Sequence, residues 1–366
     1  MTHRKMYTIL MALFVAGFSW QAGAQVQNAD VHEFPGFKQM KLMSYRYNIN
    51  IPDIDGYQTL KCDFHMHTTF SDGHVWPTMR VVEAWNDGLD AIAITDHIET
   101  KNRKNKDILQ IDLNKSGDIA AAAGNAIDLL VIRGAEITRK KPLGHINALF
   151  VQDVSKMDVP DELEAVNEAI KQGAYVQWNH PGWPDDQSTF YPVHKELIAQ
   201  KKIHGIEVFN GSELYPKTLD WCDDDGLAYL ANTDLHYASA NSYREKLQRP
   251  MTLVFAKERS TESIREALFA GRTLAYFYNH LAGKEEFLKQ IVQKSLSVKI
   301  INAEKGTIEI SNRSDITFDI RFGDYMYSVP VYANQTLRID IPSGTEVTFT
   351  NCLIREDKQL TMKLWE

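Results

Sequence analysis

The sequence has little cysteine, no excess of positive charge, and no apolar run long enough to cross a membrane comfortably. Cys62, Cys222 and Cys352 are an odd number and lie far apart, which excludes a disulfide framework. A single bridge between Cys222 and Cys352 stays open. Lys and Arg total 40 against 48 Asp and Glu, and the net charge of −8 argues against an extended nucleic-acid surface.

The N-terminus is typical of a secretory signal peptide, which we place at residues 1–24. Arg4 and Lys5 form its basic end, residues 7–20 its apolar stretch, and A-G-A its small-residue cleavage site. We therefore expect a mature chain that begins near Gln25, a periplasmic or secreted location, and no membrane span after cleavage.

The rest of the chain falls into three parts. Residues 25–58 are turn-rich and have no clear period, so we expect an N-terminal extension that wraps the main domain. Residues 59–285 alternate short apolar runs with stretches of helical spacing. The apolar runs cover residues 59–64, 90–95, 129–133, 146–151, 174–178, 206–209 and 227–231. Residues 290–366 alternate apolar and polar positions between turn signals, which predicts a small all-β, sandwich-like domain.

The alternation in the middle part predicts an α/β fold. Near-continuous apolar strands separated by helices indicate a parallel sheet that is covered on both faces. Seven strands fit a closed (β/α)7 barrel better than an open doubly wound sheet, and no G-x-G-x-x-G follows the first strand.

Residues 63–73 read DFHMHTTFSDG and place two histidines one residue apart. Side chains alternate faces along a strand, so His65 and His67 point the same way and Met66 points the other way. Two imidazoles held together resist each other's protonation, whereas neutral imidazole is a common metal ligand.

Other imidazoles and carboxylates recur at the strand ends, which is where barrel enzymes carry their chemistry. Together the candidate metal ligands are His65, His67, Asp72, His97, Glu136, His145, His180, Asp234 and His236. We expect these side chains to form one rim at the ends of the strands. Without metal, this rim would be a cluster of imidazoles and carboxylates competing for protons. Nine ligands are too many for one ion, so we expect two or three divalent ions, and nitrogen and oxygen donors suit Mn²⁺, Zn²⁺ or Fe²⁺. Clustered divalent ions suit phosphoryl chemistry.

The motifs H-M-H-T-x-F-S-D-G, I-T-D-H, G-A-E, G-H-I-N, N-H-P and N-T-D-L-H resemble those of the PHP (polymerase and histidinol phosphatase) superfamily. The resemblance implies a distorted seven-stranded barrel with a binuclear or trinuclear metal site for phosphoester hydrolysis. It implies one ion held by His65, His67, Glu136 and Asp234, and a second held by Glu136, His145 and His180. It implies a third held by Asp72, His97 and His236. Many members carry histidine where this chain has Asp72, and carboxylate is a competent ligand there.

The stretch from Ser71 to Glu99 further resembles a secreted phosphodiesterase branch of the superfamily. We therefore expect a secreted enzyme that hydrolyses small organic phosphodiesters through a metal-activated hydroxide. The predicted catalytic residues are Asp72 and His236, together with Arg244 as a bidentate phosphate clamp. Basic residues beside the ligands are further candidates for attracting phosphate: Lys101, Arg103, Lys104, Lys106, Arg139, Lys140 and Lys141.

The sequence leaves three alternative functions open. A phosphomonoesterase of the histidinol-phosphatase type fits the motifs, although a signal peptide does not suit amino-acid biosynthesis. A nuclease lacks a basic track for a strand. A protein that binds metal or another ligand without catalysis would follow from a missing phosphate clamp. The sequence does not indicate the oligomeric state.

Two further expectations concern the surroundings of the ligands. Asp63 shares the strand parity of His65, and we expect Asp63 and Asp96 to accept hydrogen bonds from ligand imidazoles. Four aromatic residues flank ligands and could form a wall for an ester group: Trp76, Trp178, Trp183 and Tyr237.

Overall fold

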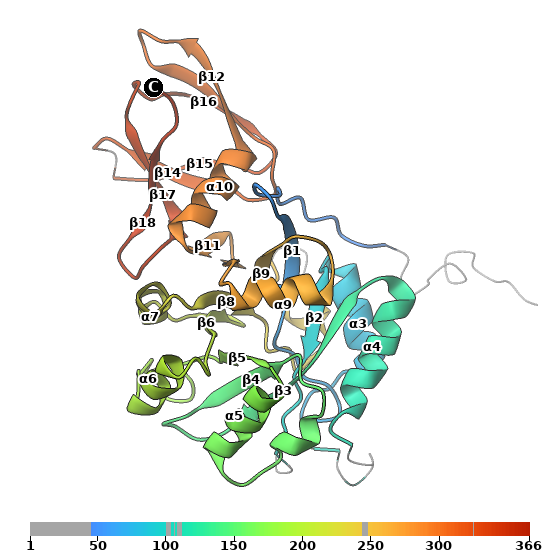
Figure 1. The fold of residues 1–366 in the computed structure, drawn as a ribbon. Helices are drawn as coiled ribbons and strands as arrows, with labels where there is room; N and C mark the ends of the chain where they lie inside the picture. The colour runs from blue at the N-terminus through green and yellow to red at the C-terminus, as the bar shows by residue number, and fades with distance from the viewer. Residues whose placement is uncertain (1–44, 100–103, 106, 108–111, 244–247, 325) are drawn as a thin grey trace, which may run out of the picture. The chain divides into compact units, whose positions relative to one another are not determined.

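A computed structural model describes residues 45–99, 104, 105, 107, 112–243, 248–324 and 326–366 (Figure 1). The predicted signal peptide, the extension as far as residue 44, and Arg244 lie outside these residues. The three cysteines are buried free thiols, so the bridge left open between Cys222 and Cys352 is absent. Among the helices of the described ranges, none is long and apolar enough to span a membrane.

The predicted alternation of strands and helices is present. The first part contains β1 (Gln58–Asp63), α3 (Pro77–Asn86), β2 (Ala91–Ile94), α4 (Lys115–Ile127), β3 (Leu130–Thr138), β4 (His145–Leu149), η2 (Val154–Met157), α5 (Glu162–Lys171), β5 (Tyr175–Trp178), α6 (Pro192–Ala199), β6 (Gly205–Asn210), β7 (Glu213–Leu214), α7 (Lys217–Asp225) and β8 (Ala228–Asn232). It continues with α8 (Ser239–Ser242), β9 (Met251–Ala256), α9 (Thr261–Phe269), β10 (Thr273–Phe277), β11 (His280–Gly283) and α10 (Glu285–Ser295).

Local signals explain where several helices begin. Pro77 opens α3, where its missing N–H would have no partner within the helix. The Asp161 side chain accepts a hydrogen bond from the Glu164 N–H at 2.8 Å and caps α5. The Ser260 hydroxyl oxygen accepts from the Ser263 N–H at 3.1 Å and caps α9. The helical spacing seen in the sequence is therefore confirmed for these three helices.

The main sheet is rich in parallel pairs but is not uniformly parallel. Its path runs β9-β1-β2-β3-β4-β5-β6, and β8 also pairs with β6. The pairs β1/β2, β2/β3, β5/β6 and β6/β8 are parallel, whereas β4 is antiparallel to both β3 and β5. The expectation of a wholly parallel sheet is wrong at β4, because an apolar run indicates a buried strand without indicating its direction.

The segment that follows β8 returns to the segment that follows β1. Met66 and Leu235 form a parallel bridge. The His67 N–H donates to the Leu235 carbonyl at 3.0 Å, and the Asp234 N–H donates to the His65 carbonyl at 2.9 Å. Two parts of the sequence that are about 170 residues apart therefore lie side by side.

The C-terminal part is all-β. It contains β12 (Leu296–Asn302), β13 (Thr307–Asn312), β14 (Phe318–Phe322), β15 (Val329–Val331), β16 (Thr336–Asp340), β17 (Glu346–Leu353) and β18 (Gln359–Lys363). Strands β12, β13 and β16 form a separate sheet, while β14, β15, β17 and β18 join the main sheet because β17 pairs in parallel with β11.

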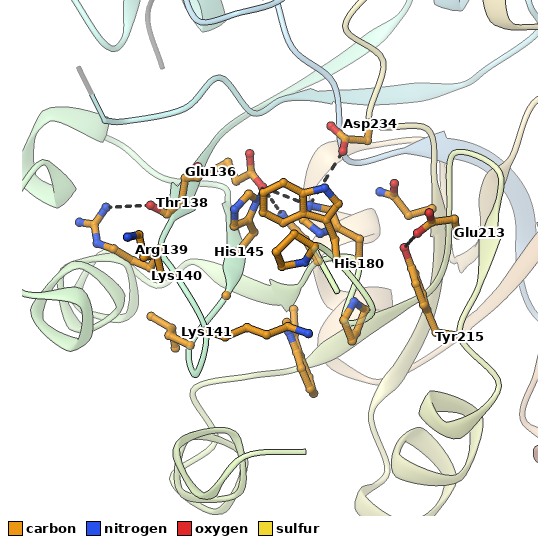
Figure 2. Close-up of a pocket in the computed structure, with 18 of the residues that line it drawn as sticks. Glu136, Thr138, Arg139, Lys140, Lys141, His145, His180, Glu213, Tyr215 and Asp234 are labelled. Atoms are coloured by element: carbon orange, nitrogen blue, oxygen red, sulfur yellow. Dashed lines mark hydrogen bonds and ion pairs between the residues drawn. The ribbon is translucent and has the colours of Figure 1, made fainter. Parts of the chain in front are cut away.

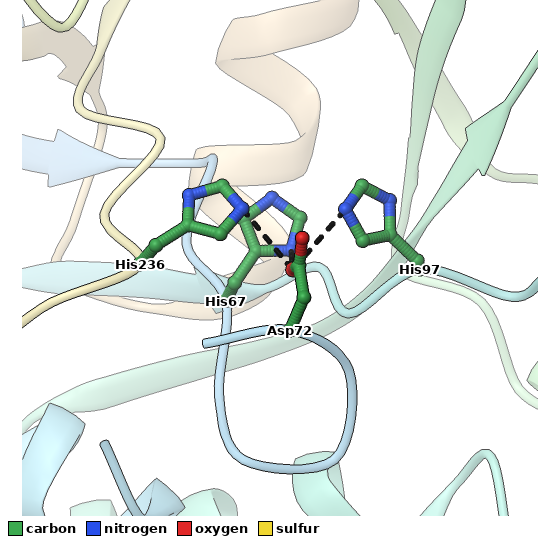
Figure 3. A group of neighbouring side chains, drawn as sticks. All are labelled: His67, Asp72, His97 and His236. Atoms are coloured by element: carbon green, nitrogen blue, oxygen red, sulfur yellow. Dashed lines mark ion pairs between the residues drawn. The ribbon is translucent and has the colours of Figure 1, made fainter. Parts of the chain in front are cut away.

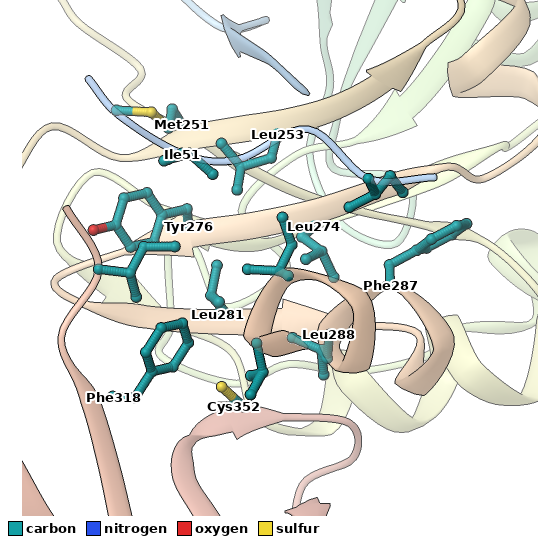
Figure 4. Close-up of a cluster of buried hydrophobic side chains, with 14 of the residues drawn as sticks. Ile51, Met251, Leu253, Leu274, Tyr276, Leu281, Phe287, Leu288, Phe318 and Cys352 are labelled. Carbon is teal, nitrogen blue, oxygen red and sulfur yellow. The ribbon is translucent and has the colours of Figure 1, made fainter. Parts of the chain in front are cut away.

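A single hydrophobic cluster joins the C-terminal strands to the preceding elements. Leu253, Leu281 and Leu288 lie in it beside Phe318 and Cys352 (Figure 4). The described end of the N-terminal extension reaches the same region, because the Asn50 N–H donates to Asp315 Oδ2 at 2.7 Å. Asn50 therefore contacts the segment between β13 and β14, while Ile51 lies in the same hydrophobic cluster as Leu253 of the main sheet.

Candidate metal centre

The nine predicted ligands lie at one end of the main sheet. They are carried by the segments after β1, β2, β5 and β8, by β3, and by the first residue of β4: His65, His67, Asp72, His97, Glu136, His145, His180, Asp234 and His236. Glu136 lies inside β3, two residues before its end at Thr138, rather than at the end of the strand. His145 is on this rim because β4 is antiparallel to its neighbours, so its start lies beside their ends.

Four of the ligands form an outer group around Asp72, which we define as His67, Asp72, His97 and His236 (Figure 3). One donor atom from each lies within 4.8 Å of the others. The Nε2 atoms of His236 and His97 are 3.1 and 3.3 Å from Asp72 Oδ1. Since an imidazole–carboxylate set at this spacing can surround one cation, the outer group is a candidate ion site.

A second group lies deeper and consists of His65, His67 and Asp234, whose donor atoms also lie within 4.8 Å of one another. Asp234 Oδ1 is 2.9 Å from His67 Nε2 and 3.2 Å from His65 Nε2. His67 belongs to both groups, so the two candidate sites are adjacent.

Glu136 is the centre of the remaining ligands. Its Oε1 is 3.0 Å from His145 Nδ1 and 3.6 Å from both His65 Nε2 and His180 Nε2. Its Oε2 is 2.7 Å from His97 Nδ1. Glu136, His65 and His180 form a third cluster of donors within 4.8 Å. This carboxylate therefore lies between the deep ligands and the outer group.

The charges of these groups depend strongly on one another. Burial raises the carboxyl pKa of Asp72, Glu136 and Asp234, but the neighbouring imidazoles outweigh it and hold each pKa well below its usual range. Burial lowers the pKa of His97, yet Glu136 and Asp72 raise it to about 10. Burial and the nearby His97 lower the pKa of His67 to about 4. The carboxylates are therefore ionised at neutral pH, as metal ligands must be.

Three carboxylate oxygens test whether cations fit here. Asp72 Oδ1, Glu136 Oε2 and Asp234 Oδ1 are buried, and no described residue donates a hydrogen bond to them. A buried ionised oxygen without a donor is unfavourable unless a cation neutralises it. Each of the three oxygens faces an imidazole nitrogen at 2.7 to 3.1 Å, and this set of nitrogen and oxygen donors suits divalent ions.

Glu207 holds the deep ligands in place, and we did not predict it from the sequence. The side chain is fully buried in β6. Its oxygens accept hydrogen bonds from His65 Nδ1 at 2.8 Å, Gln177 Nε2, Asn232 Nδ2, the His180 N–H and Asn210 Nδ2. Because a carboxylate only accepts, the proton of neutral His65 lies on Nδ1 and its Nε2 lone pair is directed at the ligand cluster.

Asp63 does not accept from an imidazole, contrary to our expectation. Its Oδ2 accepts from Arg249 Nη2 at 2.8 Å and from the Thr233 hydroxyl at 2.5 Å. Arg249 is itself buried and also pairs with Asp87 at 2.6 Å. Asp63 is therefore part of a buried ion-pair network below the ligands, and its contribution to them is through the adjoining backbone.

Asp96 contacts the ligand His67 indirectly, through Ser71. It accepts from the Thr68 N–H at 2.7 Å and from the Ser71 hydroxyl at 2.6 Å. The Ser71 oxygen is 3.4 Å from His67 Nδ1. The expected contact with an imidazole is therefore made by Ser71, which Asp96 orients.

Arg80 ties the two ligand-bearing segments together. Its buried guanidinium donates to the carbonyls of His67 at 3.0 Å, Leu235 at 3.2 Å and Tyr237 at 2.9 Å. Glu83 Oε2 accepts a further bond at 2.8 Å. One side chain of α3 therefore fixes the segments that carry His67 and the ligands after β8.

A pocket of about 940 Å³ opens onto the ligands (Figure 2). Arg139, Lys140 and Lys141 line one side of it. Arg139 forms an ion pair with Glu99, and Lys141 forms one with Asp185. Two of the three basic side chains on this wall are therefore already neutralised within the protein.

The four aromatic residues differ in their surroundings. Trp183 lines the pocket and is 53% exposed. Trp178 also lines the pocket, but it is 3% exposed and belongs to a hydrophobic core cluster. Trp76 and Tyr237 are exposed but do not line the pocket. Other predicted phosphate-attracting residues lie outside the described residues: Lys101, Arg103, Lys106 and Arg244.

Comparison with solved structures identifies the family. A two-domain protein of Bacteroides vulgatus, containing a predicted PHP-like metal-dependent phosphoesterase, superposes with a TM-score of 0.82. It is 38% identical, and the match covers 87% of this chain and 98% of that one. The chain belongs to the PHP-like metal-dependent phosphoesterases. This PHP-like chain is also 37% identical over 192 residues to an uncharacterised protein of Methanocaldococcus jannaschii, covering 48% of the chain and 82% of the relative. No family model matches it.

Proposed function

We propose that this protein is a secreted metal-dependent phosphodiesterase that hydrolyses small organic phosphodiesters. The observation that carries the proposal is the convergence of the nine predicted ligands: seven of them line one pocket, and the other two, His65 and His67, lie in the donor clusters beneath it. Two or three ions of Mn²⁺, Zn²⁺ or Fe²⁺ held there would lower the pKa of a water nucleophile and stabilise the phosphoryl oxygens.

The protein's own residues orient this chemistry. Glu207 fixes His65 through Nδ1, and the Asp234 carbonyl lies 2.9 Å from His236 Nδ1, so Nε2 of each ring is turned toward the ligand cluster. Asp72 and His236 are 22% and 28% exposed. They are therefore placed to contact a substrate directly, and we assign them the catalytic roles expected from the sequence.

The charge of the pocket favours a diester over a monoester. A phosphomonoester carries up to two negative charges at neutral pH, whereas a diester carries one. Arg139 and Lys141 are paired with Glu99 and Asp185, which leaves Lys140 as the basic side chain of this wall without an ion pair in the described structure. We keep Arg244, which lies outside the described residues, as a proposed phosphate clamp.

The remaining parts of the proposal follow the sequence. Residues 1–24 would direct export to the periplasm or beyond and then be removed. We propose that β1 to β6 and β8 form the distorted (β/α)7 barrel of residues 59–285. Residues 290–366 would form the sandwich-like domain, with β12, β13 and β16 as one sheet and with β14, β15, β17 and β18, which continue the main sheet through β11, as the other.

The decisive experiment is a panel of phosphoesters tested with the metal-stripped protein reloaded separately with Mn²⁺, Zn²⁺ or Fe²⁺. Bis(p-nitrophenyl) phosphate should be hydrolysed with a higher kcat/KM than p-nitrophenyl phosphate. His67→Ala and Glu136→Ala should abolish both activities, and His280→Ala should retain them because His280 is an exposed histidine outside the pocket.

Each other outcome selects an alternative. A clear preference for the monoester would indicate a phosphomonoesterase. Metal binding without turnover of any ester would indicate a binding protein. Full activity after exhaustive chelation would remove the metals from the reaction altogether.

A further inference from the structure

The pocket has walls of opposite charge on the two sides of the metal ligands. Figure 2 shows Arg139 and Lys140 on one side of His180, and Glu213 and Tyr215 on the other. A pocket of about 940 Å³ can hold a whole small ester rather than its phosphate alone. The acidic wall is therefore available to the group that is esterified to phosphorus.

The acidic wall is a rigid hairpin. Glu213 pairs with Asn210 across a tight turn, in which Gly211 has a φ of +58° that suits glycine. The Gly211 N–H donates to the Asn232 carbonyl at 3.0 Å, and the Asn210 side chain donates to Glu207 at 2.8 Å. The hairpin is thus attached to the same carboxylate that orients His65, so its position relative to the ligands is fixed.

The Glu213 carboxylate has no cationic partner among the described residues. The Tyr215 hydroxyl donates to Glu213 Oε2 at 2.5 Å. Burial and this hydrogen bond raise the pKa of Tyr215, so the hydroxyl remains a donor at neutral pH. Glu213 therefore presents an oriented negative charge, in contrast to the paired Arg139 and Lys141 on the other wall.

Aromatic rings accompany this charge. A Cβ atom added to Gly182 would lie 2.7 Å from Tyr215 Cε1, so the loop that carries Trp183 is in close contact with the Tyr215 ring. Trp183 lines the same pocket and exposes 53% of its surface. The Tyr215 ring itself is 5% exposed, so Tyr215 positions the carboxylate and Trp183 supplies the exposed aromatic face of the pocket. Proteins bind ammonium groups with carboxylates and with exposed aromatic faces.

We propose that Glu213, Tyr215 and Trp183 form a subsite for a positively charged amine on the alcohol part of the substrate. The phosphate would lie at the metal ligands and the ammonium group at the hairpin. The inference rests on the proposed phosphodiesterase function for the phosphate, but the ammonium subsite itself can be tested without turnover.

The kinetic test compares two esters of one shape. p-Nitrophenyl phosphocholine carries a quaternary ammonium, and p-nitrophenyl 3,3-dimethylbutyl phosphate has carbon in its place. We expect kcat/KM to favour the cationic ester by about tenfold, and Glu213→Gln to reduce this ratio by about five- to tenfold, mainly through KM. Glu196→Gln, which changes an exposed glutamate outside the pocket, should keep the wild-type ratio.

The binding test uses choline and 3,3-dimethylbutan-1-ol, titrated calorimetrically into the full chain. Choline should bind more tightly than the alcohol, and Glu213→Gln should remove the difference, with Tyr215→Phe intermediate. Equal binding of the two ligands to the wild type would overturn the subsite. Discrimination by binding without hydrolysis of either ester would support the subsite and reject the phosphodiesterase function. Hydrolysis of both esters, with a kcat/KM ratio that Glu213→Gln leaves unchanged, would support the phosphodiesterase function and reject the subsite.

Discussion

Glu207→Gln is the sharpest test of how the metal ligands are oriented. The substitution keeps the size of the side chain but replaces one acceptor oxygen with an NH2 group. If the amide oxygen stays toward His65, the new NH2 group faces the His180 N–H and the Asn210 side-chain amide, which now donate to Oε2 at 2.9 and 2.8 Å. If the amide turns over, His65, Gln177 and Asn232 lose their shared acceptor instead.

Either orientation leaves buried donors without an acceptor. Each such donor costs about 1–3 kcal/mol, so the loss of two acceptors should lower the free energy of unfolding of the metal-free protein by about 2–6 kcal/mol. Loss of the partner that orients a metal-bound histidine lowers metal affinity by about 10–100-fold in comparable sites. We expect both effects at Glu207, because the same carboxylate contacts a ligand ring and the backbone of another ligand.

Two measurements separate the effects. Urea unfolding of the metal-free protein gives the stability change, and competition with a chromophoric chelator gives the metal affinity. Glu196→Gln is the matched control, since Glu196 is exposed on α6. Weaker folding with unchanged metal affinity would show that Glu207 only supports the fold, and values equal to the control in both assays would refute the reasoning.

The other predictions concern stability. Arg80→Met should lower the free energy of unfolding by about 3–5 kcal/mol, measured with urea, because it leaves buried carbonyls and a carboxylate without their donor. Burial lowers the pKa of His194 and His204 to about 4, so the unfolded chain binds more protons between about pH 6.5 and 4. Stability should therefore be fully present above about pH 6.5 and fall as the pH drops towards 4, and His204→Gln should reduce that slope in urea titrations at several pH values. Gly182→Ala should cost about 1–3 kcal/mol in the same assay, since its Cβ would overlap the Tyr215 ring.

The sequence was sufficient for elements whose signal is local. Alternation along an extended chain predicted that His65 and His67 point the same way. Both lie beyond the end of β1, where Met66 bridges Leu235, and their Nε2 atoms are 3.2 Å apart. His145 was predicted on the correct rim, but the sequence did not show that it begins an antiparallel strand. The direction of β4 depends on its pairing with β3 and β5 and not on its own residues.

Long-range partners could not be predicted in this way. Asp63 pairs with Arg249, which is 186 positions away, and no local pattern links the two. Glu207 had a usable signal, because it interrupts the six-residue buried strand GIEVFN. A carboxylate in such a strand requires hydrogen-bond donors nearby. The residues next to Glu207 in the sequence do not show which donors the other strands supply.

The backbone at two ligands shows why the centre depends on the whole fold. His180 and Asp234 have φ values of +24° and +52°, a region that residues with side chains seldom adopt. Such conformations persist only where neighbouring contacts determine them. The His180 N–H is held by Glu207 at 2.9 Å, and the Asp234 N–H by the His65 carbonyl at 2.9 Å. Each strained ligand is therefore fixed by a residue from another strand, so the ligand geometry can form only when β1, β5, β6 and β8 have come together.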